Sequence, residues 1–361
     1  MLFVCSALPL MSGALRPDYR SEIERLILKA ISKDKIPGLS VAVVSQGHMI
    51  YSGVFGEADV ENHVPASVDS LFRTASIAKP ITATAALALA AAGRLNLDGP
   101  IQDYCPAFPK KPWTITPREL LSHRSGIRHY KSETLDDPEV GSVHHYARLS
   151  DAFVLFGEDP LVHQPGTAFL YSTFGYTVLG CVLEGAAGES FQTLMKQYVF
   201  APADMQHSTL DDARKIISNR VRGYDLGRDG QLENAPCIDS SDKYPAGGLL
   251  TTAIDLAHFI EHLYSGTLIP AGLREEMWTP VTNLSNGRGY ALGWGTYSYR
   301  DMKALAHSGD QQGAIATILL IPEKQLGIAI LANTENADVD TLAKHIVDAV
   351  LVTPPSVLLK H

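Results

Sequence analysis

The sequence predicts an α/β fold in which one antiparallel sheet is built from both ends of the chain and a mainly helical part is inserted between them. Two observations predict it. Strand-like runs separated by turn residues occur near the amino terminus and again in the carboxyl-terminal third, whereas residues 81–234 alternate helical runs with Pro- and Gly-rich connections. We therefore expect an α/β domain from residues 18–80 and 240–361, and a helical domain from residues 81–239.

The terminal elements follow from the spacing of apolar residues. Residues 19–34 carry Ile23, Leu26, Ile27 and Ala30 on one helical face. The segment "IPGLSVAVVSQGHMIYSGVFGEAD" predicts a hairpin around the turn "SQGH". Near the other end, "MKALAHSGDQQGAIATILLIPEKQLGIAILANT" contains three strand-like runs, and a helix follows from about residue 339 to residue 351. Antiparallel strands with terminal helices at both ends favour a single shared sheet.

Composition bounds the class of protein. The chain has 361 residues, of which 45% are hydrophobic, so it can bury a large core. The net charge is −9, from 39 acidic and 30 basic residues, and no basic run stands out, so nucleic acid is not an expected partner. No window approaches the roughly 18 consecutive apolar residues of a membrane span.

Two features bear on the compartment. The chain has four cysteines, Cys5, Cys105, Cys181 and Cys237. They are widely spaced and form no CxxC pair, so we expect inert thiols and neither a zinc site nor a disulfide framework. The first residues, "MLFVCSALPLMSGALRPDY", change abruptly from apolar to polar, like the hydrophobic part of a secretory signal, but they lack a basic start. This favours a periplasmic or secreted location over the cytoplasm and leaves open an apolar tail that packs on a domain.

The stretch "RTASIAKPITATAALALAAAGRL" places a serine and a lysine three positions apart at the front of an almost wholly apolar helix. Pro80 is tolerated in the first turn only, so the helix begins near Ser76, and Gly93 ends it. Because a helix that is apolar all round is buried, Lys79 loses solvation, its pKa falls, and its neutral amine can activate Ser76. Taken alone, the pair also fits an N-cap serine and a lysine that reaches solvent.

Two other stretches supply further parts of a serine hydrolase site. In "PGTAFLYSTFGYTVLG", Tyr171 lies in a turn ahead of a helical run and can direct its phenol into a cleft, although packing against phenylalanines explains it too. In "LAHSGDQQGAIATILL", His307, Ser308 and Gly309 open a strand, along which a substrate can lie and where the amide of Asp310 can face an oxyanion. The sequence contains neither GxSxG nor HExxH, which argues against an α/β-hydrolase and a zincin.

Four other residues are expected to play structural or peripheral parts. His123 and His129, in "LLSHRSGIRHY", are predicted to pack at a helix end and in a loop. Trp294 is predicted to lie in the core, and a place in the cleft wall stays open for it. The segment "DSSDKYPAGG" is predicted to form a rim of the site through Tyr244.

In their order and separation, the three motifs resemble those of the serine β-lactamase-like superfamily, which includes penicillin-binding proteins, class C β-lactamases, and esterase and peptidase relatives. That family uses SxxK, then Tyr-x-Asn, then Lys-Thr-Gly or a variant such as His-x-Gly. The segments "IPGLSVAVV", "LDGPIQDYCP", "ELLSHRSGI", "AGGLLTTAIDLAHF" and "YALGWG" also look like the family, so the resemblance covers residues from about 36 to 333. Within it, "FRTASIAK", "LLSHRSGIRHY", "YSTFGY" and the His-Ser-Gly motif are most similar to the LACTB-like branch.

The resemblance implies a β-lactamase/penicillin-binding-protein-like fold, an antiparallel sheet flanked by helices with an inserted helical domain and an active-site cleft between the two parts. It implies that Ser76 attacks a carbonyl, that Lys79 takes its proton, and that Tyr171 shuttles a proton to the leaving group. It further implies an oxyanion site made by the amides of Ser76 and Asp310, and no metal or organic cofactor. The other implied site residues are His307 among the catalytic groups, and Ser308, Gly309 and Thr173 at the substrate.

Two departures from the family pattern shape the expected activity. Thr173 stands where the family usually has Asn, and His307 stands where β-lactamases have a Lys, so a fixed cation is replaced by a group that is mostly neutral at pH 7. We therefore expect a carboxylesterase on short-chain esters with weak or no β-lactamase activity. A serine peptidase or amidase, an acyltransferase, and a non-catalytic scaffold on the same fold stay open. The expected partner is a small-molecule ester or peptide-like substrate, and a homo-oligomer stays open.

Overall fold

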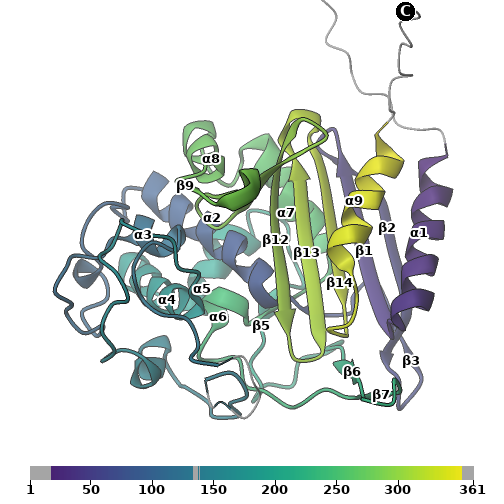
Figure 1. Cartoon of the computed structure of the whole chain (residues 1–361), viewed down its shortest axis with the longest axis horizontal. Coiled ribbons are helices and arrows are strands. Elements are labelled where there is room, and N and C mark those ends of the chain that lie inside the picture. Colours follow the sequence, from purple (N-terminus) through teal and green to yellow (C-terminus); the bar gives the residue numbers. More distant parts are fainter. Residues whose placement is uncertain (1–17, 133–136, 138, 352–361) are drawn as a thin grey trace, which may run out of the picture.

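The computed structural model describes residues 18–132, 137 and 139–351. Its central sheet is antiparallel throughout, in the strand order β3-β2-β1-β14-β13-β12-β11-β10-β9 (Figure 1). Strand β1 (Gly38–Ser45) pairs with β14 (Leu326–Ala332), so strands from the two ends of the chain meet in the middle of the sheet. The predicted fold class, a sheet shared by both ends and joined to a helical part, is confirmed.

The elements with which this sheet is built lie close to their predicted bounds. Strand β2 (His48–Asp59) completes the amino-terminal hairpin. The predicted carboxyl-terminal strands are β12 (Met302–Gln311), β13 (Ala314–Ile321) and β14. The remaining strands of the sheet are short: β3 (Val64–Pro65), β9 (Thr282–Asn283), β10 (Gly289–Tyr290) and β11 (Gly295–Tyr299). Strands outside it are β4 (Phe72–Arg73), β5 (Thr209–Leu210), β6 (Tyr224–Leu226), β7 (Leu232–Asn234) and β8 (Leu249–Thr251).

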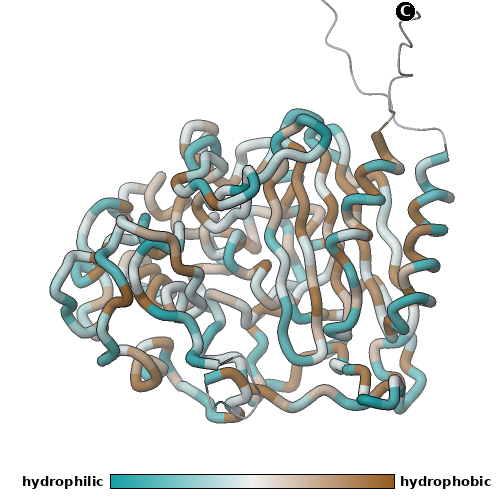
Figure 2. Tube along the Cα trace, viewed as in Figure 1, coloured by the Kyte–Doolittle hydropathy of each residue, from teal (hydrophilic) through white to brown (hydrophobic). Residues whose placement is uncertain are grey.

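Helices cover both faces of the sheet (Figure 1). On one face, α1 (Tyr19–Asp34) packs beside α9 (Val339–Val350), and their apolar residues share a hydrophobic cluster with β1, β13 and β14. On the other face, α7 (Ala253–Ser265) packs against β1 and β14, and a second cluster continues from there into the helical part. Figure 2 shows hydrophobic residues along the sheet strands and a mixture of hydrophobic and hydrophilic residues along α1, as expected for a surface helix.

The helical part is centred on two buried helices, α2 (Ala78–Ala91) and α4 (Thr173–Ala187). The shorter helices α3 (Pro117–Leu121) and α5 (Phe191–Met195) complete it. Two further short helices, α6 (Tyr244–Gly247) and α8 (Ala271–Trp278), lie nearer the sheet. Trp294 is fully buried, which confirms its predicted place in the core. The boundaries predicted between the two domains, near residues 80 and 240, stay a prediction.

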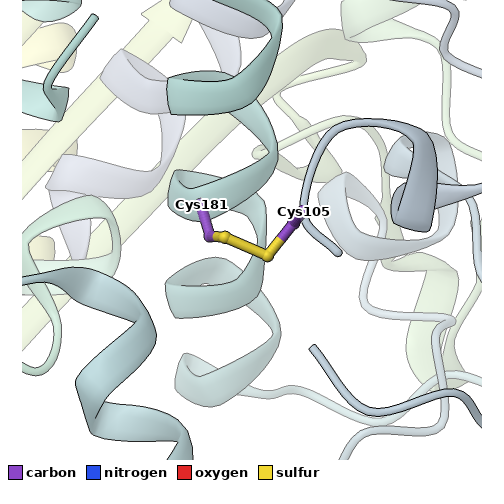
Figure 3. Close-up of a disulfide and its surroundings, with 2 residues drawn as sticks. All are labelled: Cys105 and Cys181. Atoms are coloured by element: carbon purple, nitrogen blue, oxygen red, sulfur yellow. A yellow bond between two sulfur atoms is a disulfide. The ribbon is translucent and has the colours of Figure 1, made fainter. Parts of the chain in front are cut away.

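A disulfide joins Cys105 to Cys181 of α4 (Figure 3), so the prediction that these two cysteines are inert thiols is wrong. A separation of 76 residues gives no hint of the pairing. Packing explains it: a Cβ added at Gly185 would collide with the carbonyl oxygen of Tyr104, so glycine lets the Cys105 segment lie directly against α4. Cys237 is an exposed free thiol.

The apolar amino-terminal stretch and Cys5, which bear on the predicted location, lie outside the described residues. Among the residues that the structure describes, no helix is both long enough and apolar enough to cross a membrane.

Candidate active site

The predicted nucleophile lies where a short 3-10 turn, η1 (Ala75–Ile77), leads into α2. The backbone amide and the hydroxyl of Thr74 both donate to the carbonyl of Leu249, at 3.0 and 3.1 Å, which ties the start of this turn to β8. Ala75 has a φ of +43°, a left-handed conformation that costs a non-glycine residue roughly 1–3 kcal/mol. The surrounding structure therefore holds Ser76 in a strained turn at the front of a buried helix.

Lys79 follows one helical turn later and reaches the nucleophile. Its Nζ lies 3.0 Å from Oγ of Ser76 and 2.9 Å from the carbonyl oxygen of Ala246. The side chain is fully buried, and burial, followed by the charge of Lys243, lowers the pKa of its amine well below the usual value. A neutral amine at this distance can accept the proton of the Ser76 hydroxyl.

Tyr171 brings a second proton-carrying group to Ser76. It directly precedes Ser172, the N-cap residue of α4, whose hydroxyl accepts from the amide of Gly175 at 2.9 Å. The phenol of Tyr171 hydrogen bonds to Ser76, and Nζ of Lys79 lies 4.9 Å from the centre of its ring. Burial raises the pKa of the phenol, and the hydrogen bond to Ser76 lowers it by a smaller amount. The phenol is therefore protonated near neutral pH and can pass a proton to a group that leaves from Ser76.

The third predicted stretch forms the end of β12, beyond Ala306, where its pairing with β11 ends. A Cβ added to Gly309 would lie 2.5 Å from the backbone nitrogen of Ser76 and 2.7 Å from the carbonyl oxygen of Thr74. Glycine thus permits a backbone approach that a side chain would block. This approach places the backbone of Gly309 beside the amide of Ser76. The amide of Asp310, the next residue, stays the predicted second donor of an oxyanion site.

These parts open onto one cleft of about 600 Å³. Six of the predicted site residues line it: Ser76, Tyr171, Thr173, Ser308, Gly309 and Asp310. Lys79 and His307 are buried and are not among the lining residues. The structure therefore brings the three motifs together, while the catalytic roles of their residues stay a prediction.

His307 belongs to a buried chain of hydrogen-bonding rings. Its Nδ1 lies 2.7 Å from the carbonyl oxygen of Ser308, and its Nε2 lies 3.2 Å from the hydroxyl of Tyr290. That hydroxyl lies 3.1 Å from Nε2 of His123, whose Nδ1 accepts from the amide of Ser172 at 3.1 Å. The predicted packing role of His123 is therefore incomplete, because its ring also holds the backbone next to Tyr171 and lies 4.3 Å from that ring.

The partners of these rings assign their protons. Nδ1 of His123 accepts, so its Nε2 carries the proton and donates to Tyr290. Nδ1 of His307 donates to a carbonyl, so its Nε2 accepts from Tyr290. Burial is the main cause that lowers both pKa values, that of His307 to about 3. Both imidazoles are neutral, with the proton on opposite nitrogens.

Sequence reasoning missed several residues of the cleft. His129 lines it and accepts from the amide of Thr173 at 3.3 Å, so its predicted role in loop packing is incomplete. The segment "DSSDKYPAGG" borders the cleft as predicted, but Tyr244 itself is buried and does not line it. The neighbouring Lys243 lines it instead. The only available signal was its position in a segment already expected to border the site.

Known proteins resemble this chain over most of its length. A model of the β-lactamase family matches residues 23–351. The human mitochondrial serine β-lactamase-like protein LACTB is 31% identical over 386 residues, which cover 81% of this chain and 70% of that protein. Protein flp of Staphylococcus aureus (strain MW2) is 28% identical over 342 residues, which cover 92% of this chain and 66% of that protein.

Three solved structures share the fold. The octameric penicillin-binding protein homologue from Pyrococcus abyssi has a TM-score of 0.79 at 24% identity and covers 91% of this chain and 76% of its own. The D-amino acid amidase from Ochrobactrum anthropi has a TM-score of 0.79 at 20% identity, with 91% and 98% covered. A hydrolase with promiscuous acyltransferase activity has a TM-score of 0.78 at 21% identity, with 92% and 98% covered.

Proposed function

The chain belongs to the β-lactamase family, and on that premise we propose that it is a serine hydrolase that forms an acyl-enzyme on Ser76. The observation that carries the proposal is the distance of 3.0 Å between Nζ of Lys79 and Oγ of Ser76. Because Lys79 is buried and its pKa is lowered, its amine is available as a base beside the nucleophile.

The proposed reaction has two steps. The Ser76 oxygen attacks the substrate carbonyl while Lys79 takes its proton, and the amides of Ser76 and Asp310 bind the oxyanion. As the bond to the leaving group breaks, Tyr171 donates a proton to it and recovers one from Lys79. Water then attacks the acyl-enzyme by the same route in reverse, which releases the acid and restores the serine.

We assign a short-chain carboxylester as the first substrate class. The neutral His307 offers no positive charge where β-lactamases have a lysine, which disfavours β-lactams. Thr173 replaces the usual Asn, and its hydroxyl is engaged with Tyr130. An ester needs neither of the lost groups, because an alcohol protonated by Tyr171 leaves more readily than an amine does.

An amide or peptide substrate is the second candidate. Its nitrogen must be protonated in order to leave, and the contact between Tyr171 and Ser76 supports that step. The amidase among the fold relatives shows that the fold can carry such a reaction, and the octameric relative makes a homo-oligomer worth measuring in solution.

The test compares p-nitrophenyl acetate and butyrate with peptide anilides, with Ser76→Ala as the control. We expect ester turnover, its loss in Ser76→Ala, and labelling of the wild-type chain by a fluorophosphonate at Ser76. Faster turnover of the anilides would favour the peptidase. Absence of both turnover and labelling would refute the hydrolase.

A further inference from the structure

Lys243 lies in the wall of the cleft and takes no direct part in the proposed proton transfers, although its charge helps to lower the pKa of Lys79. It directly precedes α6, where its carbonyl oxygen accepts from the amides of Ala246 and Gly247 at 2.9 and 2.8 Å, so its backbone is fixed. The residue is only 7% exposed, yet it lines the same cleft as Ser76. Its Nζ lies 5.9 Å from the ring centre of Tyr130.

The Nζ of Lys243 forms no ion pair with any residue that the structure describes. Among the residues that the structure describes, no carboxylate oxygen lies within 4.0 Å of its Nζ, and no side-chain hydrogen bond is made by it. The adjacent Asp242 is coupled to it electrostatically but lies beyond ion-pair distance. The Nζ is reached from the cleft and faces no described carboxylate at ion-pair distance, so it is available to bind an anionic group of a ligand.

The opposite wall of the cleft has the other sign. Asp310 on β12 and Asp340 on α9 line it, and the hydroxyl of Ser308 donates to Asp340 at 2.7 and 2.6 Å. Glu335 lines it too, but burial raises the pKa of its carboxyl to about 7, so this group is only partly charged near neutral pH. Among the described lining residues, Lys243 is the only lysine or arginine. An anionic group on a bound substrate is therefore repelled by the wall of Asp310 and Asp340 and attracted to the wall of Lys243.

We propose that Lys243 is the substrate-anchoring cation of this cleft and that the preferred acyl donors carry a carboxylate on the acyl part. The inference rests on the proposed serine hydrolase function. The acyl part stays bound through both chemical steps, so a carboxylate on it can be held until water releases the product. Lys243 thereby provides anion recognition on the wall opposite to the third motif.

The test uses two p-nitrophenyl esters of equal chain length, the glutarate monoester and the valerate. We expect the wild type to prefer the glutarate ester, chiefly through KM. Lys243→Gln should lower the ratio of the two kcat/KM values by roughly 10- to 100-fold, as expected for loss of one charge-assisted contact. Lys243→Arg should keep the preference, and Lys243→Glu should reverse it in favour of the valerate ester, because a carboxylate at this position repels the glutarate. Lys324→Gln, at an exposed turn outside the cleft, is the matched control.

The ratio separates binding from chemistry, because any effect of Lys243 on Lys79 acts on both esters alike. An unchanged ratio in Lys243→Gln would overturn the inference and leave the hydrolase intact, whereas loss of valerate turnover and of phosphonate labelling in the wild type would overturn the proposed function itself. If Lys243→Gln fails to fold, inhibition of wild-type ester hydrolysis tests the same contact between Lys243 and a carboxylate. Monomethyl glutarate should inhibit and methyl valerate should not, and equal inhibition by both would contradict the inference.

Discussion

Substituting Gly309 by alanine tests the geometry around the nucleophile most directly. The added Cβ would lie 2.5 Å from the nitrogen of Ser76, and ordinary contact begins near 3.4 Å, so one backbone must move by about 0.9 Å. A displacement of about 1 Å at a reacting centre costs roughly 100-fold, and loss of one oxyanion donor costs roughly 100- to 1,000-fold. We therefore expect kcat for p-nitrophenyl butyrate to fall by at least about 100-fold.

The control is Gly272→Ala in α8, where an added Cβ meets nothing within 4 Å. It should leave kcat unchanged. Thermal unfolding of both variants separates lost geometry from lost folding, because Gly309→Ala should remain folded. A folded Gly309→Ala variant with kcat within threefold of the wild type would refute the proposed arrangement of the oxyanion site.

Three further predictions concern the base, the ring chain and the disulfide. A pH profile of kcat should decline as pH falls through the lowered pKa of Lys79, because the amine becomes protonated. In Lys243→Gln this decline should move to higher pH, because a positive charge that lowers the pKa of Lys79 has been removed. In His123→Asn the side-chain amide oxygen can replace Nδ1 as the acceptor for the Ser172 amide, so we expect kcat to fall by only roughly 10-fold. In His123→Gln no acceptor lies near that position, so kcat should fall by roughly 100-fold, and KM should change little in either variant. Replacing Cys105 and Cys181 together by serine should lower the free energy of unfolding by up to about 4.5 kcal/mol, because the unfolded chain is no longer restrained by a loop with a sequence separation of 76. In urea titrations, added reductant should destabilise the wild type and leave the double variant unchanged.

The sequence predicted the sheet well because its strands carry local signals. The hairpin turn at Gln46 and Gly47 has positive φ values of 54° and 77°, which glycine-containing turns adopt readily, and apolar runs flank it. Pro80 and Gly93 similarly mark the two ends of the buried helix. Each of these signals depends on residues close together in the chain.

What depends on distant residues could not be predicted. The disulfide requires the Tyr104 segment to lie against Gly185, and no local pattern encodes that approach. Lys243 similarly looks like an ordinary polar residue until the fold places it in the cleft. The ring chain from His123 to His307 joins positions that are remote in sequence, so the hydrogen bonds that assign their protons could not be inferred from local patterns.

The charge pattern of the site follows from that ring chain. To become a cation, His307 would need a proton on Nε2, which already accepts from Tyr290, so the Tyr290 hydroxyl would have to turn away in a buried space. These hydrogen bonds therefore disfavour a positive charge on His307, close to Lys79, whose own pKa is lowered mainly by burial. In the proposed mechanism Lys79 is the base, and the neutral His307 does not attract an anion. The cleft wall of Lys243 is then the place where an anionic substrate group gains most, so the proposal assigns chemistry and substrate selection to different lysines.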